Sequence, residues 1–182
     1  MIKRPIRASG ETLPVIGLGT WQVFDVPGTP EEIALRRRIV QALVDSGGSL
    51  IDTSPMYDRS EKVIGDVIEA GIDRRELFLA TKVWTDGRAA GEEQMRRSFE
   101  LMNTDVVDLM QVHNRRDLAV HMETIREWQE AGRIRYNGVT DYRESAHDEM
   151  EDVMRRYRPQ FIQINYSLGE HGADDRVLPM AA

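Results

Sequence analysis

The sequence contains no cysteine among its 182 residues. Disulfide bonds, zinc sites with thiolate ligands, iron–sulfur clusters and a cysteine nucleophile are therefore excluded. No run of about 18 apolar residues occurs, so no membrane-spanning helix is predicted. The basic residues near Met1 are not followed by an apolar stretch, which argues against a secretory signal peptide. We therefore expect a cytoplasmic protein.

An excess of basic residues is also missing. Lys and Arg number 24 against 31 Asp and Glu, which gives a net charge of −7. Because phosphate contacts need clustered Lys or Arg, this balance argues against a nucleic-acid partner. Three histidines, His121, His147 and His171, are expected on the surface or in loops. No two of these histidines have the spacing of metal ligands, so no metal site is predicted.

Short apolar segments alternate with amphipathic helical patterns along the chain. Six strands are predicted, at 14–21, 49–52, 77–82, 106–113, 134–140 and 161–166. Helical patterns lie at 30–45, 60–70, 94–102, 122–132, 145–157 and 175–182, and a small hairpin turn is expected at 7–12. Thr29 and Glu32 have the spacing of a capping box at the first helix. Apolar strands alternating with helices indicate a parallel sheet, hence an α/β protein with one domain over 1–182.

Such a sheet either stays open, as in a doubly wound fold, or closes into an eight-stranded barrel. Gly17 and Gly19 match the first two positions of a dinucleotide fingerprint, but Gln22 stands at the third. No helix begins until Thr29, so this segment is not a dinucleotide-binding turn. The missing fingerprint argues against the open doubly wound sheet but decides only partly between the two architectures.

A polar residue marks the end of every predicted strand. These residues are Thr20, Asp52, Lys82, His113, Thr140 and Gln163. In a parallel sheet the ends lie on one side, and in a barrel they meet at one mouth, where barrel enzymes place their chemistry. Burying a polar group without a partner costs roughly 2 kcal/mol. We therefore expect these side chains to be partners of one another.

Tyr57 follows Asp52 by five residues and joins this titratable cluster. The ordinary phenol pKa of about 10 is too high for a good acid at neutral pH. A neighbouring ammonium at Lys82, held by Asp52, is expected to lower the Tyr57 pKa. His113 is expected to donate to or accept from the oxygen of a bound carbonyl, and the group suits proton donation to a developing alkoxide. A Schiff-base role for Lys82 is the alternative, which borohydride trapping would detect.

Five segments together resemble the aldo-keto reductases, in the right order and spacing over nearly the whole chain. They are 17–21, 51–65, 81–84, 108–113 and 138–140. The resemblance implies a (β/α)8 TIM barrel that binds NADPH across its mouth. It also implies hydride transfer to a small carbonyl substrate, an aldehyde or ketone.

The resemblance further implies roles for ten residues. Tyr57 matches the proton donor, Lys82 and Asp52 its activators, and His113 the orienting residue. Thr140, Asp141 and Gln163 match the residues that hold the nicotinamide carboxamide, Thr20 and Trp21 line the cofactor and substrate, and Trp84 forms a wall of the substrate pocket. Asp141 stands where Asn is usual and can accept but not donate a hydrogen bond. Asp58 replaces a common Gly.

A complete barrel of this class needs about 250 residues, whereas this sequence holds about six strand–helix units. We therefore expect an incomplete barrel that is truncated at its C-terminal end. The remaining expectations are weaker NADPH binding than in full-length relatives and self-association through open sheet edges. The alternative to an enzyme is a non-catalytic reductase-like module, or a fragment that needs a partner chain to complete the barrel.

Overall fold

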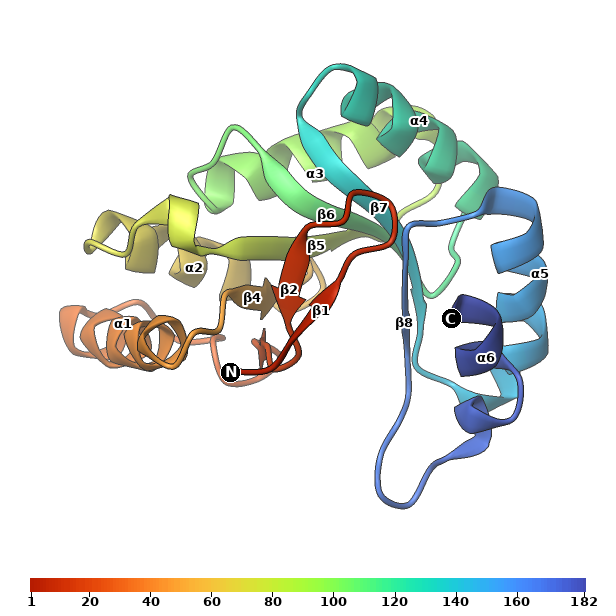
Figure 1. Ribbon diagram of the computed structural model, residues 1–182. Coiled ribbons are helices and arrows are strands. Elements are labelled where there is room, and N and C mark those ends of the chain that lie inside the picture. The colour runs from red at the N-terminus through yellow and green to blue at the C-terminus, as the bar shows by residue number, and fades with distance from the viewer.

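A computed structural model describes residues 1–182 and contains one fully parallel six-stranded sheet. Its strands are β3 (Leu18–Gly19), β4 (Leu50–Asp52), β5 (Phe78–Val83), β6 (Val107–His113), β7 (Ile134–Asp141) and β8 (Phe161–Ile164). The order in the sheet is the order in the sequence. An open doubly wound sheet reverses its strand order at a switch point, and this curled sheet does not (Figure 1). The α/β class and the incomplete barrel are confirmed.

Helices connect the strands and cover the outer face of the sheet (Figure 1). They are α1 (Pro30–Asp45), α2 (Ser60–Glu69), α3 (Arg88–Leu101), α4 (Leu118–Glu130), α5 (His147–Tyr157) and α6 (Val177–Ala181), with short 3-10 turns η1 (Arg74–Glu76), η2 (Glu144–Ala146) and η3 (Gly172–Asp174). The predicted capping box of α1 is confirmed, because Thr29 and Glu32 each accept a backbone N–H of the other. No helix has the length and apolar character needed to cross a membrane.

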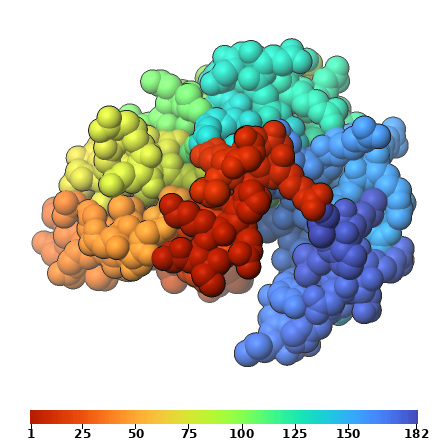
Figure 2. Space-filling model, in the orientation of Figure 1, coloured from red at the N-terminus to blue at the C-terminus, as the bar shows by residue number.

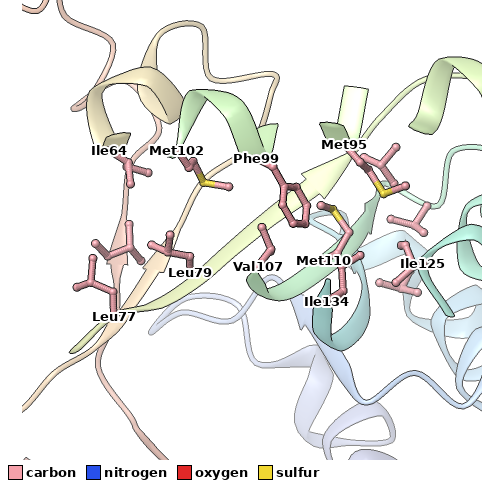
Figure 3. Packing of buried hydrophobic residues seen from close by; sticks show 14 of the residues in the cluster. Ile64, Leu77, Leu79, Met95, Phe99, Met102, Val107, Met110, Ile125 and Ile134 are labelled. Atoms are coloured by element: carbon pink, nitrogen blue, oxygen red, sulfur yellow. The ribbon is translucent and has the colours of Figure 1, made fainter. Parts of the chain in front are cut away.

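Strand β5 shows how the sheet divides its side chains between two apolar regions. Leu79 and Val83 belong to the large core between sheet and helices, whereas Phe78 and Ala80 belong to a smaller cluster on the inner face. In Figure 3 side chains of α2 and α3 point toward the strands in the large core. The alternation of a strand then places Lys82 on the inner face, two residues beyond Ala80.

An N-terminal hairpin covers the inner cluster at the amino ends of the strands. Strands β1 (Lys3–Pro5) and β2 (Thr12–Pro14) pair antiparallel, as the predicted turn requires. The Tyr136 hydroxyl lies 2.6 Å from Ser9 Oγ and donates to Glu11 Oε2 at 2.7 Å. In Figure 2 the hairpin lies in the middle of the face shown, between the early helices and the C-terminal part.

Two expectations are wrong in detail. Helix α3 begins at Arg88 rather than near residue 94, because its first turns carry few apolar residues and show no apolar periodicity. His121 is fully buried rather than on the surface, and its Nε2 lies 2.8 Å from the Thr85 carbonyl oxygen. The ring fits because Gly91 faces it, where a Cβ atom would lie only 2.5 Å from the His121 Cε1.

Candidate active site

A buried ion pair joins the carboxyl ends of β4 and β5. Lys82 Nζ donates to both carboxylate oxygens of Asp52 and to the carbonyl oxygen of Thr53, each at 2.8 Å. These three acceptors use all three protons of an ammonium group. Burial lowers the pKa of Lys82, whose side chain is only 1% exposed, and the charge of Asp52 opposes that effect.

Tyr57 lies on the loop after β4, and the Lys82 Nζ stands over its ring, 5.1 Å from the centroid. The backbone N–H of Tyr57 donates to the Ser54 carbonyl oxygen at 3.0 Å, which closes a turn. Burial, together with the negative charge of Asp52, raises the pKa of Tyr57 to about 12. The expected lowering of this pKa is therefore wrong. The ammonium meets the ring face and directs its protons to Asp52 and Thr53 instead of the phenol oxygen.

His113 ends strand β6 and faces the tyrosine. The two ring centroids are 6.2 Å apart and the rings are nearly perpendicular, at 89°. The Nδ1 atom of His113 lies 3.1 Å from the Ser54 Oγ. Burial, followed by the charge of Lys82, lowers the pKa of His113 to about 4. The imidazole is therefore neutral at physiological pH.

A cavity of about 560 Å³ opens at this mouth of the sheet. Its volume is within the range of small-molecule sites, roughly 300–1,000 Å³. The structure gathers most of the predicted site residues in its lining: Trp21, Tyr57, Lys82, His113, Thr140, Asp141 and Gln163. Asp52 reaches this group through its ion pair with Lys82.

Besides Asp52, two predicted site residues, Thr20 and Trp84, lie outside the lining of this cavity. Thr20 is buried and donates through Oγ1 to the carbonyl oxygen of Asp52 at 3.0 Å, which supports the backbone behind the site. The ring of Trp84 is covered by the guanidinium of Arg116, 4.3 Å from the ring centroid. The backbone N–H of Trp84 donates to Gln94.

Asp141 lines the cavity but is already bound by two arginines. Its Oδ1 accepts from the backbone N–H and the Nε of Arg143, and its Oδ2 accepts from Arg143 Nη2 and Arg115 Nε, all between 2.9 and 3.0 Å. Burial raises the pKa of this carboxyl, but these hydrogen bonds outweigh burial and hold the pKa at about 2. Four hydrogen bonds fill the accepting capacity of the carboxylate.

Gln111 is a site residue that the sequence did not single out. It pairs in register with Lys82, and its Nε2 lies 3.5 Å from Asp52 Oδ1 and 3.3 Å from Gln163 Oε1. The amide nitrogen of Gln163 and the hydroxyl of Thr140 keep no protein partner. The available signal was strand alternation, which puts Gln111 on the inner face two residues before His113.

Ser54, Asn114, Tyr142 and Asn165 were missed as well. The last three line the cavity from the loops that follow β6, β7 and β8. Asn114 has a positive φ of 50°, and the Oδ1 of its side chain is buried without a partner. Loop residues of this kind carry no periodic pattern, so no local signal indicates where they lie.

A curled parallel sheet with titratable groups collected at the carboxyl ends of its strands is the arrangement of the β/α-barrel enzymes. The chain belongs to the aldo/keto reductase family, whose family model matches residues 15–182.

Two curated relatives and one solved structure illustrate the similarity. The aldo-keto reductase YhdN of Bacillus subtilis is 34% identical over 91% of this chain, which spans 54% of that protein. The methylglyoxal reductase YeaE of Escherichia coli is 30% identical over 98% of this chain, which spans 64% of that protein. An aldo-keto reductase from Klebsiella pneumoniae, crystallised with NADPH, is 28% identical with a TM-score of 0.81 over 98% of this chain and 64% of that one. The chain is therefore substantially shorter than these relatives.

Proposed function

We propose that this chain carries the carbonyl-reducing site of an NADPH-dependent oxidoreductase. In this reaction an aldehyde or ketone becomes an alcohol by hydride transfer, with Tyr57 as the proton donor. The observation that carries the proposal is the single cavity that Tyr57, Lys82 and His113 share. The NADPH in the Klebsiella relative and the name of the methylglyoxal reductase support it.

The lining of the cavity fits the nicotinamide end of the cofactor. The Thr140 hydroxyl and the Gln163 amide nitrogen, both without partners in the chain, match the acceptor and donor atoms of a carboxamide. Trp21 is 64% exposed and offers an aromatic face for stacking. We propose that Asp141 contributes by holding Arg115 and Arg143 in place, because its own oxygens are occupied. When bound, NADPH supplies the hydride.

The protein side chains then handle the charge that develops on the carbonyl oxygen. Tyr57, with a pKa of about 12, stays protonated at neutral pH and holds its proton until the alkoxide forms. The ammonium of Lys82 stabilises the phenolate that remains after the proton has left, from 5.1 Å away across the ring. Asp52 keeps this ammonium charged and in place, and His113 orients the carbonyl oxygen.

The Schiff-base alternative for Lys82 finds little support in this geometry. A nucleophilic amine needs a free lone pair, whereas the Lys82 nitrogen donates to three acceptors. Borohydride added with an aldehyde should leave the mass of Lys82 peptides unchanged. A stable mass increase at Lys82 would favour covalent catalysis.

The direct test follows NADPH oxidation by the folded chain with methylglyoxal and a set of short aldehydes. The Tyr57→Phe variant should lose activity, and the Tyr166→Phe variant should keep it, because Tyr166 lies outside the cavity and bonds Asp174. Activity equal in wild type and Tyr57→Phe, or none in a wild-type chain that melts cooperatively, would overturn the proposal. The second result would favour the non-catalytic module.

Association of copies is a further part of the proposal. Strand β3 pairs only with β4, and β8 pairs only with β7, so each end strand of the sheet has a free edge. Free edges present unpaired backbone groups that pair with other chains. We propose that the single barrel domain over 1–182 associates through these edges. The cytosolic location and an NADPH affinity below that of longer relatives stay predictions.

A further inference from the structure

The Ser54 hydroxyl stands between the Tyr57 loop and His113. Ser54 is 0% exposed, and its Oγ has two neighbours, the backbone nitrogen of Met56 at 3.2 Å and the Nδ1 of His113 at 3.1 Å. The Met56 N–H can only donate, so one lone pair of the hydroxyl oxygen is used there. The remaining question is which of Ser54 and His113 supplies the proton between them.

The proton count decides this question. A hydroxyl has one proton, and a buried proton without an acceptor costs about 1–3 kcal/mol. The only acceptor next to the Ser54 hydroxyl is His113 Nδ1. A proton on Nδ1 would leave the Ser54 proton without any partner in a fully buried position. The Nδ1 atom must therefore be the acceptor.

We infer that Ser54 is a positioning residue that donates its hydroxyl proton to His113 Nδ1 and so places the ring proton of His113 on Nε2, facing the cavity. The imidazole is neutral because burial and the charge of Lys82 hold its pKa at about 4, so it has a single ring proton. His113 lines the cavity, and its Nε2 has no partner within the chain and is not sealed from solvent.

This tautomer determines that His113 presents a hydrogen-bond donor, and not an acceptor, to a ligand in the cavity. A carbonyl oxygen accepts hydrogen bonds, so it meets two donors, the Nε2–H of His113 and the hydroxyl of Tyr57. The opposite tautomer would present a nitrogen lone pair to the same oxygen and repel it. This consequence rests on the proposed function, whereas the tautomer itself does not.

The same serine also shapes the loop that carries the tyrosine. Its Oγ accepts from the Met56 N–H and its carbonyl oxygen accepts from the Tyr57 N–H at 3.0 Å. Ser54 therefore couples the turn that presents Tyr57 to the ring orientation of His113. Threonine keeps the hydroxyl that this coupling needs, and alanine removes it.

Long-range proton–nitrogen correlation spectra of the ¹⁵N-labelled chain test the inference without turnover. His113→Gln assigns the signals of this ring among those of the four histidines. At pH 7 the His113 Nε2 should give the signal of a protonated nitrogen, and Nδ1 that of a bare nitrogen accepting a hydrogen bond. Ser54→Ala should move the Nδ1 signal to higher frequency, whereas Ser54→Thr should leave it in place. Ser98→Ala, which removes another buried serine hydroxyl on α3, should change neither signal.

A proton found on Nδ1 of the wild-type chain would overturn the inference, even if Ser54→Ala fails to fold. An unchanged Nδ1 signal in a folded Ser54→Ala variant would overturn it too. If the chain reduces aldehydes, Ser54→Ala should lower kcat/KM about five- to tenfold and Ser54→Thr should restore it. Absence of turnover with the expected spectra would contradict only the proposed function, so the two failures are distinguishable.

Discussion

Lys82 meets Tyr57 at the face of its ring, with Nζ 5.1 Å from the centroid, and not at its hydroxyl. The ammonium thus stands ready to compensate a phenolate while its protons are bonded to Asp52 and Thr53. The acid form of Tyr57 dominates the resting site because burial and Asp52 raise its pKa to about 12.

The rate of carbonyl reduction should be almost independent of pH over a wide range. Tyr57 must be protonated to act, and its pKa is about 12, whereas His113 becomes charged only near its pKa of about 4. We expect a flat kcat/KM from about pH 5 to about pH 10 in steady-state assays. A drop in kcat/KM centred near pH 8 would show that the phenol pKa is low in the working enzyme.

Stability should fall in mild acid because of His113. Its pKa is about 4 in the folded chain against an ordinary 6.5, so the unfolded chain takes up this proton first as the pH falls. The contribution is complete above pH 6.5 and is lost as the pH falls toward 4. Urea unfolding at pH 7.5 and at pH 5 should show a smaller difference for His113→Gln than for wild type. His171→Gln changes an exposed histidine and should behave like wild type.

Breaking the ion pair on one side should be costly. Asp52→Asn leaves the charge of Lys82, 1% exposed, without its carboxylate and should lower the free energy of unfolding by about 3 kcal/mol. The double variant Asp52→Asn/Lys82→Met should regain much of this loss in urea unfolding. Glu100→Gln, which breaks the exposed pair with Arg97, should change the free energy of unfolding by less than about 0.5 kcal/mol. Additive effects of the two site changes would contradict a coupled pair.

Gly65 lies where helix α2 closely approaches the end of α3. A Cβ at this position of α2 would lie 2.1 Å from the backbone carbonyl oxygen of Leu101 at the end of α3. Gly65→Ala should therefore push the helices apart and destabilise the chain by about 2–3 kcal/mol. Gly169→Ala meets nothing within 4 Å and serves as the control in thermal unfolding. Equal melting temperatures for the two variants would refute this contact.

Sedimentation velocity tests association through the sheet edges. We expect a concentration-dependent shift toward dimers or larger species, because β3 and β8 each have a free edge. Proline in place of Ile162 disturbs the backbone of the end strand β8 and should reduce the shift. The control is Ile39→Ser on α1, which changes an exposed apolar side chain outside both end strands. A monodisperse monomer over a wide concentration range would disprove the proposed association.

Local sequence signals accounted for most of the fold. The Thr29–Glu32 capping box and most of the apolar strands are encoded by neighbours in the chain, and the structure confirms them. The buried strand predicted at 14–21 is an exception, because only Leu18–Gly19 pairs in the sheet and Val15 and Ile16 are exposed. The Asp52–Lys82 pair was also predictable, because strand ends meet in a parallel sheet whatever its closure. These features need no knowledge of distant packing.

Other features depend on contacts between segments that are far apart in the sequence, and no local pattern reveals such contacts. The buried His121 needs the space that Gly91 leaves on another helix. The two arginines on Asp141 come from different loops, and the arginine nearer to β6, Arg115, has a positive φ of 58°. The direction of the Tyr57 pKa shift depends on burial, which the spacing of charged residues does not report.

The stretch from Asp52 to Tyr57 supplies the carboxylate, the Thr53 carbonyl, the serine hydroxyl and the phenol. The first two bind Lys82 on β5, and the serine hydroxyl meets His113 at the end of β6. An inserted or deleted residue there would misalign all of these groups at once. Sequence changes in this loop among relatives should therefore be substitutions that keep its length. Divergence in ligand preference should instead accumulate in the loops after β6, β7 and β8, where Asn114, Tyr142 and Asn165 border the cavity. The segment of constant length and the variable cavity border thus lie on different loops of the protein.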